Sequence, residues 1–278
     1  MIHRRGFLLA GATALGGMPT TAISKGQIPM THIVLLGDSI FDNAAYVAGG
    51  PDVVRQLREI LPSGQRATLN ARDGAVIADL PQQLRSVPAG ATHLVVSVGG
   101  NDALGESGLL DRKVGSMAEA LELITAVRER FRSAYARMLD QVLLRKLPVA
   151  ACTIYEARFP EPVTRRLAAT ALTALNDAIT REAFARNVDC IDLRILCDDD
   201  RDFANPIEPS VHGGAKIAKS HLPVRHFERS ALPARHCPVG SSRCGCECGS
   251  GRNGRIGSRS SPAAFPKQCS RLHQREPK

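Results

Sequence analysis

The stretch that decides the fold is residues 32–43, which read HIVLLGDSIFDN. Its first five residues form a continuous apolar run, which is typical of a strand buried on both faces of a parallel sheet. The second part, GDSIFDN, is small and polar and follows that strand as a loop. In an open parallel sheet, ligands bind beyond the carboxyl ends of the strands, so this loop is the first candidate for a functional site.

The same alternation continues along the chain. Long patterns of apolar residues at helical spacing lie between further short apolar runs. A strand followed by a helix, repeated about five times, predicts one α/β domain with a flavodoxin-like, three-layer α/β/α arrangement around a central parallel sheet of about five strands. The expected strands are residues 32–36, 67–70, 93–98, 148–154 and 188–193, and the clearest helices are residues 51–61, 116–146 and 162–186.

Composition supports one folded domain with different ends. The chain has 278 residues, of which 44% are hydrophobic, enough to fill a core. Its net charge of +9 is carried entirely by residues 219–278, whereas residues 30–218 hold 21 basic and 24 acidic side chains. The basic balance therefore says nothing about what the domain, expected over residues 30–220, binds. No apolar run approaches the roughly 20 residues of a membrane-spanning helix.

The first 29 residues resemble a twin-arginine export signal. Arg4 and Arg5 precede a weakly apolar run from Phe7 to Met18, and small residues follow. This predicts an exported, periplasmic protein. The alternative is a cytoplasmic protein whose translation starts at Met30, one residue before the first strand begins to form.

Residues 221–278 differ from the domain in composition. They are rich in Arg, Ser, Gly, Pro and Cys and lack periodic apolar residues, so we expect a disordered tail. The CxCxC run from Cys244 to Cys248 lacks the spacing of a zinc site, and no metal or other cofactor is expected. The tail also lacks interleaved aromatic residues, so no nucleic-acid partner is expected.

Three loops after successive strands carry the groups that acyl transfer needs. The first contains Asp38 and Ser39, the second Gly74, and the third Asn101. Ser39, at a strand-to-helix turn, would be an exposed nucleophile whose own N–H lies at a helix N-terminus. The Gly74 N–H and the Asn101 side chain would complete an oxyanion hole. These residues indicate ester hydrolysis.

The motifs GDSIFDN, DGA and GGND, in this order, resemble the first three sequence blocks of the SGNH (GDSL-like) hydrolases over roughly residues 31–218. That family comprises esterases, lipases and deacetylases with a flavodoxin-like fold. The resemblance implies that Ser39 is the nucleophile. It also implies that the Ser39 N–H, Gly74 and Asn101 form the oxyanion hole.

The fourth block departs from the family pattern. The family normally carries DxxH followed by Pro, five residues before a Gly, and counting back from Gly213 places Glu208 at the histidine and Asn205 at the aspartate. A serine needs a base to take its proton. Glu208 can act as this base only if burial raises its pKa. His212, one helical turn later, is a second candidate. The third possibility is that the chain has no base at this site.

The leading hypothesis is a serine esterase acting on a small-molecule carboxylic ester, with short acyl or acetyl groups on a carbohydrate or small alcohol as examples. Asp38 is expected to fix the turn around Ser39 rather than to react. The rival hypothesis is a module of the same fold that has lost catalysis and binds an acyl or carbohydrate ligand. The sequence gives no indication of oligomeric state.

Overall fold

A computed structural model of the chain describes residues 30–220. The expectations about an export signal in residues 1–29, a tail in residues 221–278 and its CxCxC run lie outside the described residues. Within residues 30–220, no helix has both the length and the hydrophobicity needed to cross a bilayer.

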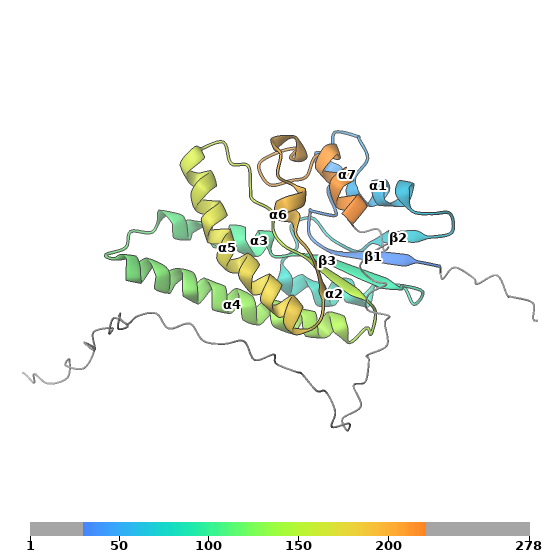
Figure 1. The fold of residues 1–278 in the computed structure, drawn as a ribbon, viewed down its shortest axis with the longest axis horizontal. Helices are drawn as coiled ribbons and strands as arrows, with labels where there is room; N and C mark the ends of the chain where they lie inside the picture. The colour runs from blue at the N-terminus through green and yellow to red at the C-terminus, as the bar shows by residue number, and fades with distance from the viewer. Residues whose placement is uncertain (1–29, 221–278) are drawn as a thin grey trace, which may run out of the picture. The chain divides into compact units, whose positions relative to one another are not determined.

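The predicted fold class is confirmed. Five parallel strands form one sheet in the order β2-β1-β3-β4-β5, the arrangement of flavodoxin-like folds (Figure 1). Each strand overlaps its predicted run, with small shifts at the ends. The strands are β1 (His32–Gly37), β2 (Arg66–Leu69), β3 (His93–Ser97), β4 (Val149–Cys152) and β5 (Asp189–Ile191).

Helices cover both faces of this sheet. The long predicted helices are present, and several shorter ones occupy the connections. The α-helices are α1 (Val53–Ile60), α2 (Leu80–Arg85), α3 (Gly100–Gly105), α4 (Met117–Leu143), α5 (Pro162–Ala185), α6 (Leu193–Leu196) and α7 (Val211–Ser220). Four 3-10 helices are η1 (Ala44–Tyr46), η2 (Ile77–Asp79), η3 (Ser107–Asp111) and η4 (Asp200–Asp202).

The alternation of side chains along the strands divides the core into two halves. Val34 and Leu36 of β1 pack with residues of α2, α4 and α5. Ile33 and Leu35 of the same strand pack on the opposite side, with residues of α1, α6 and α7. Every residue of β1 is buried, and its residues from Ile33 to Leu36 are all apolar, as expected for an inner strand of a parallel sheet covered on both faces.

Two long helices extend beyond the sheet. With 27 residues, α4 spans roughly 40 Å, whereas the strands beside it have at most six residues. In Figure 1, α4 and α5 converge near their C-terminal ends and separate toward their N-terminal ends. Ser116 and Glu161 cap the two N-termini by accepting hydrogen bonds from backbone N–H groups. The separated N-terminal halves of α4 and α5 line part of the site described next.

Candidate active site

The first loop begins where β1 meets β3 at very short range. Gly37 has φ +133°, and a Cβ atom placed there would lie 1.7 Å from the Ser97 carbonyl oxygen, so only glycine fits. The next residue, Asp38, donates its N–H to that same Ser97 oxygen at 3.0 Å. The strand therefore ends at a fixed point, and Ser39 follows in a tight turn.

The turn around Ser39 differs from the sequence expectation in one respect. We expected a helix to begin at Ser39, but the chain makes a single turn in which Phe41 and Asp42 donate to the Asp38 carbonyl, and no α-helix begins before Val53. A helix dipole therefore does not act on Ser39. Asp38 fixes the turn as expected, because its carboxylate accepts the Ile40 N–H at 3.1 Å. Ser39 is buried rather than exposed.

Gln83 of α2 supports this turn through its side-chain amide, a role that the sequence did not indicate. Its side-chain oxygen accepts the Gly37 N–H, and its side-chain nitrogen donates to the Gly37 carbonyl, each at 2.7 Å. Gln83 is buried, and these two bonds give both the oxygen and the nitrogen of its amide a partner within the core. A lone glutamine in a short helix carries no motif that would have identified this role.

The second loop is bound to the first. The Arg72 N–H donates to the Gly37 carbonyl at 3.0 Å, and the Asp73 N–H donates to the Asp42 carboxylate at 3.0 Å. Gly74 follows with φ +76°, is exposed, and would have no atom within 4 Å of an added Cβ. The second loop therefore presents the Gly74 backbone to open space.

The third loop reaches across to the second. Gly99 adopts φ +119° against the Phe131 ring, and α3 starts immediately after it. The Asn101 side chain donates to the Ala75 carbonyl at 3.0 Å, and the Asp102 carboxylate accepts the Ile77 N–H at 3.1 Å. Asn101 is thus brought beside the residue that follows Gly74, as the order of the loops predicts.

The three predicted oxyanion-hole donors differ in whether they already donate a hydrogen bond within the protein. Within residues 30–220, neither the Ser39 N–H nor the Gly74 N–H donates a hydrogen bond to another group. The Asn101 amide uses one of its two N–H groups on Ala75. One backbone N–H from each of two loops and one side-chain N–H are therefore free to bind an oxygen atom.

The segment that carries Glu208 is held by groups from distant parts of the chain. Tyr155 donates its hydroxyl hydrogen to the Ile207 carbonyl at 2.7 Å, and the Asn43 amide donates to the Pro209 carbonyl at 3.0 Å. Asn43 is fully buried and also accepts the N–H of Val53, the first residue of α1. The loop after Ser39 and the segment around Glu208 are consequently joined directly.

Asn205 occupies the position where the family pattern has an aspartate. Its side-chain oxygen accepts the N–H groups of Ile207 and Glu208, each at 2.9 Å. It therefore shapes the turn that presents Glu208 and makes no contact with the Glu208 carboxyl group. Two backbone bonds to one side-chain oxygen hold that turn in a single conformation.

Glu208 lies beside Ser39. Its side chain is buried, with 4% of the residue exposed, and it lines the same cavity as Ser39 and Asn101. Burial raises the pKa of Glu208 to about 7, a hydrogen bond with the Ser39 side chain acts to lower it, and the charge of Asp73 raises it further. At neutral pH this carboxyl group is thus poised between its two protonation states.

Asp38 is a second buried carboxyl group at the site. Burial raises its pKa to about 7; the hydrogen bond from the Ile40 N–H opposes that shift, and the charges of Glu208 and Asp102 add to it. A negative charge on Glu208 makes ionisation of Asp38 less favourable, and by the same interaction a charge on Asp38 makes ionisation of Glu208 less favourable. The site therefore resists holding both negative charges at once.

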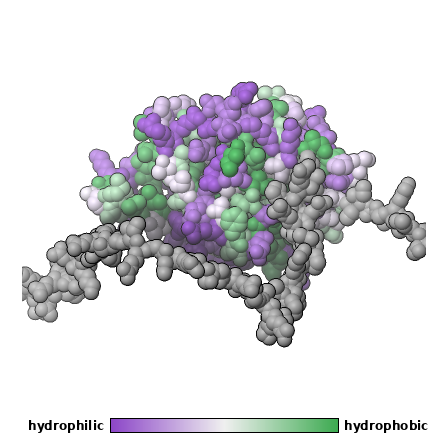
Figure 2. All heavy atoms as spheres, in the orientation of Figure 1, coloured by the Kyte–Doolittle hydropathy of each residue, from purple (hydrophilic) through white to green (hydrophobic). Residues whose placement is uncertain are grey.

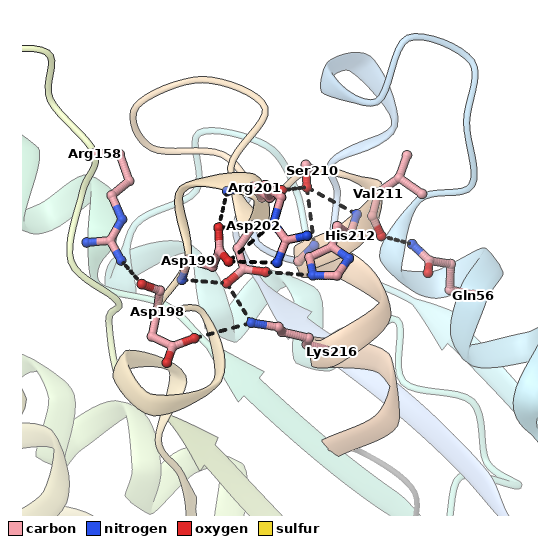
Figure 3. A network of polar contacts seen from close by, with 11 residues as sticks. Gln56, Arg158, Asp198, Asp199, Arg201, Asp202, Ser210, Val211, His212 and Lys216 are labelled. Carbon is pink, nitrogen blue, oxygen red and sulfur yellow. Dashed lines mark hydrogen bonds and ion pairs between the residues drawn. The ribbon is translucent and has the colours of Figure 1, made fainter.

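His212 lies away from this cavity, in the polar network shown in Figure 3. Its Nε2 atom lies 3.6 Å from Asp202 Oδ1, and half of its side chain is exposed. Asp202 is fully buried and also forms an ion pair with Lys216 at 2.8 Å. Of the two candidate bases, the structure places Glu208 beside Ser39 and His212 at the start of α7.

Ser39, Asn101 and Glu208 line a cavity of about 490 Å³. Asp38, Ser97 and Thr153 are the other polar residues at this end, and most of the remaining lining is apolar. Within residues 30–220, no cluster of His, Cys, Asp or Glu side chains is arranged to bind a metal ion. The polar end of the cavity can therefore supply a hydroxyl group, N–H donors and a carboxyl group of raised pKa.

Comparisons with known proteins agree with this geometry. Residues 35–217 match the model of the GDSL-like Lipase/Acylhydrolase family. No curated protein matches the chain.

Solved structures with the same fold include an extracellular lipase from Streptomyces rimosus (TM-score 0.51, 18% identity, covering 67% of this chain and 95% of that chain). A phospholipase A1 from Streptomyces albidoflavus (0.50, 16%, 69% and 98%) is also similar. So is the lipase Lip_vut3 from a goat rumen metagenome (0.53, 15%, 68% and 95%). At these identities the likeness shows the fold alone.

Proposed function

The chain belongs to the GDSL-like lipase/acylhydrolase family, and from that premise we propose that it hydrolyses carboxylic esters through an acyl-enzyme on Ser39, with Glu208 as the general base. The observation that carries the proposal is that Ser39 and the buried Glu208 line the polar end of the same cavity, with Ser39 close enough to lower the pKa of Glu208 and Glu208 Oε2 without a hydrogen-bond partner among the described residues. A nucleophile and a base within hydrogen-bonding reach of each other are the minimal requirement for this chemistry.

The first step forms the acyl-enzyme. The Glu208 carboxylate takes the proton from the Ser39 hydroxyl as Oγ attacks the carbonyl carbon of the ester. The carbonyl oxygen becomes negatively charged and accepts hydrogen bonds from the Ser39 N–H, the Gly74 N–H and the Asn101 side chain. When the tetrahedral intermediate collapses, the bond to the alcohol oxygen breaks, and Glu208 returns the proton to the leaving alcohol.

The second step releases the acid. Glu208, again a carboxylate, takes a proton from a water molecule that attacks the acyl-enzyme carbonyl. The same three donors bind the oxyanion, and collapse of this second intermediate breaks the bond to Ser39 Oγ. The proton held by Glu208 returns to Ser39, and the carboxylic acid leaves.

The raised pKa makes a carboxyl group adequate for this role. A glutamate with the ordinary pKa of about 4.3 is a poor acceptor for a serine proton at neutral pH. Burial raises the pKa of Glu208 to about 7, near the value of an ordinary histidine. Burial therefore gives this glutamate the basicity that the family obtains from its histidine.

Asn205 and Asp38 are positioning residues in this proposal. Asn205 holds the backbone of the turn on which Glu208 stands, through the N–H groups of Ile207 and Glu208. Asp38 fixes the turn that carries Ser39 and adds to the electrostatic cost of a second negative charge. His212 has no role in the proton transfers, because it faces Asp202 rather than Ser39.

The proposal is tested by hydrolysis of p-nitrophenyl acetate by the full chain and three variants. Ser39→Ala and Glu208→Gln should each lower kcat by about 10³-fold or more, as loss of the nucleophile or its base does in serine hydrolases. Ser86→Ala changes an exposed serine and should leave the rate unchanged. In the parent protein, kcat/KM should rise with pH near 7, where the coupled carboxyl groups of Glu208 and Asp38 ionise.

A fluorophosphonate probe gives an independent readout, since it labels an activated serine without turnover. The parent protein and Ser86→Ala should be labelled at Ser39, and Ser39→Ala should not. Equal rates for the parent and Ser39→Ala would overturn the proposal. Ligand binding by a parent protein that is neither active nor labelled would favour a binding module instead.

A further inference from the structure

We propose that the cavity beside Ser39 is an acyl-chain site, so that the substrate is an ester of a medium- or long-chain fatty acid. This inference rests on the proposed function, because it takes the ester carbonyl to lie at Ser39. It adds the chemical class of the acid and the residues that select it.

One wall of the cavity, on the side of α4 and α5, is built from apolar faces of these two helices, whereas Glu106, Ser107 and Asp111 line the cavity from the end of α3 and from η3. From α4 it receives Ile124 and Val127, one turn apart. From α5 it receives a face repeating at helical spacing, in which the only polar residue, Thr164, lies in the first turn. The lining residues of α5 are Thr164, Leu167, Ala168, Ala171, Leu172, Ala174 and Leu175.

The wall formed by α4 and α5 suits a hydrocarbon chain better than a polar one. A sugar or phosphate group placed against it would lose hydrogen bonds to water and find no replacement, which costs free energy for every polar group. A methylene chain loses nothing there and gains the favourable transfer of apolar surface from water. An acetyl group would fill only a small part of the roughly 490 Å³ available.

Three alanines leave the space that such a chain needs. Ala168, Ala171 and Ala174 line the cavity from α5, between larger residues that pack on the core. A larger side chain at Ala171 would project into the same space. Chain-length preference in this protein should therefore depend on these alanine positions, Ala171 above all.

The cavity reaches the surface at a second apolar feature. Leu110 of η3 and Leu167 of α5 line it and are also exposed, by 38% and 47%. Met117 and Leu121, in the first two turns of α4, are exposed by 74% and 56%. Figure 2 shows hydrophobic residues at the left end of the molecule, where Figure 1 places η3 and the start of α4. An acyl chain too long for the cavity would thus extend onto apolar protein surface.

The test compares esters that differ only in the acid. For the full chain, kcat/KM on p-nitrophenyl octanoate should exceed that on the acetate by about 10²-fold, because each buried methylene contributes up to about fourfold. Ala171→Phe should reduce the octanoate value at least about 10-fold, mainly through KM, and leave the acetate value within about twofold. Ala126→Phe places the same side chain at an exposed alanine of α4 and should change neither.

A binding assay separates this inference from the proposed catalysis. Ser39→Ala, which cannot form the acyl-enzyme, should still bind the fluorescent fatty acid cis-parinaric acid, and adding Ala171→Phe should abolish that binding. If Ala171→Phe does not fold, as judged by its melting temperature, Ala168→Leu provides a smaller obstruction at the same wall.

The outcomes are distinct. Equal kcat/KM on acetate and octanoate, or octanoate hydrolysis unaffected by a folded Ala171→Phe, would overturn the acyl-chain site even if Ser39 proved to be the nucleophile. Fatty-acid binding by Ser39→Ala together with an inactive parent protein would retain the site and overturn the proposed catalysis.

Discussion

The Gln83 side chain closes a ring of two hydrogen bonds, each 2.7 Å long, with the N–H and the carbonyl of Gly37. Gly37 is the last residue of β1, and Ser39 lies two residues beyond it. A side chain on the covering helix α2 thus fixes the two peptide groups on either side of Gly37, from which the turn carrying Ser39 starts.

Gln83→Ala should destabilise the fold and disturb the site together. It leaves the Gly37 N–H without its buried acceptor, and an unsatisfied buried group costs about 1–3 kcal/mol. We expect the free energy of unfolding in urea to fall by about 2–4 kcal/mol, counting the small cavity as well. Gln82→Ala, at the exposed neighbouring position, should change it by less than about 0.5 kcal/mol. A Gln83→Ala variant as stable as Gln82→Ala would contradict this role.

Asn101→Ala should reduce catalysis more than substrate binding. The substitution removes one oxyanion donor, which in comparable sites lowers kcat about 10²–10³-fold. It also removes the bond to the Ala75 carbonyl, which holds the loop containing Gly74. The measurement is kcat and KM on p-nitrophenyl acetate for a variant whose folding has been checked by circular dichroism. A rise in KM at unchanged kcat would assign Asn101 to substrate binding instead.

Glu208→Gln should stabilise the protein at alkaline pH. The folded pKa of Glu208 is about 7, above the reference value of 4.5, so the folded state holds this proton over a range in which the unfolded chain releases it. Stability from this group is complete below about pH 4.5 and decreases as the pH rises to about 7. The neutral amide of Gln avoids that loss, which a shift from 4.5 to about 7 puts at about 3 kcal/mol at pH 8.

Urea unfolding at pH 5 and pH 8 measures the effect. The gain from Glu208→Gln should be present at pH 8 and small at pH 5, whereas Glu122→Gln, at an exposed site on α4, should give little change at either pH. A gain that is the same at both pH values would show that burial of the charge is not its cause.

Lys216→Met should be destabilising. Lys216 forms an ion pair at 2.8 Å with Asp202, which is fully buried and has an Oδ1 atom without a hydrogen-bond partner among the described residues. Because a third of the Lys216 side chain is exposed, the loss should be smaller than for a fully buried pair, about 1–3 kcal/mol. Lys219→Met, at an exposed position of the same helix, is the control. Loss of less than about 1 kcal/mol in Lys216→Met would show that His212 or water compensates the charge.

The sheet was predictable from the sequence because its three inner strands, β1, β3 and β4, are buried on both faces. Short, mostly apolar runs such as the one from His32 to Leu36 are typical of strands that are covered on both faces. The helices α4 and α5 were predictable because their apolar residues repeat over many turns. The expected helix at Ser39 was wrong because turn hydrogen bonds through Asp38 ended the local structure after one turn.

The site was only partly predictable. Loop order placed Ser39, Gly74 and Asn101 at one edge of the sheet, since the carboxyl ends of parallel strands share an edge. Glu208 and His212 are four residues apart, and spacing alone could not tell which of them faces the serine. The structure separates them: Asn205 turns the chain before Glu208, and Asp202 lies opposite His212. Gln83, Asn43 and Tyr155 act through contacts distant in sequence, which no local pattern reveals.

The bond between Asn43 and the Pro209 carbonyl spans 166 positions of the chain. During synthesis on the ribosome, Ser39, the proposed nucleophile, emerges early, but the residue proposed to take its proton is translated only near the end of the domain. On the proposed mechanism, a nascent chain that stops short of Glu208 carries Ser39 without its base and should show no hydrolysis. Hydrolysis is then expected only after most of the domain has been translated.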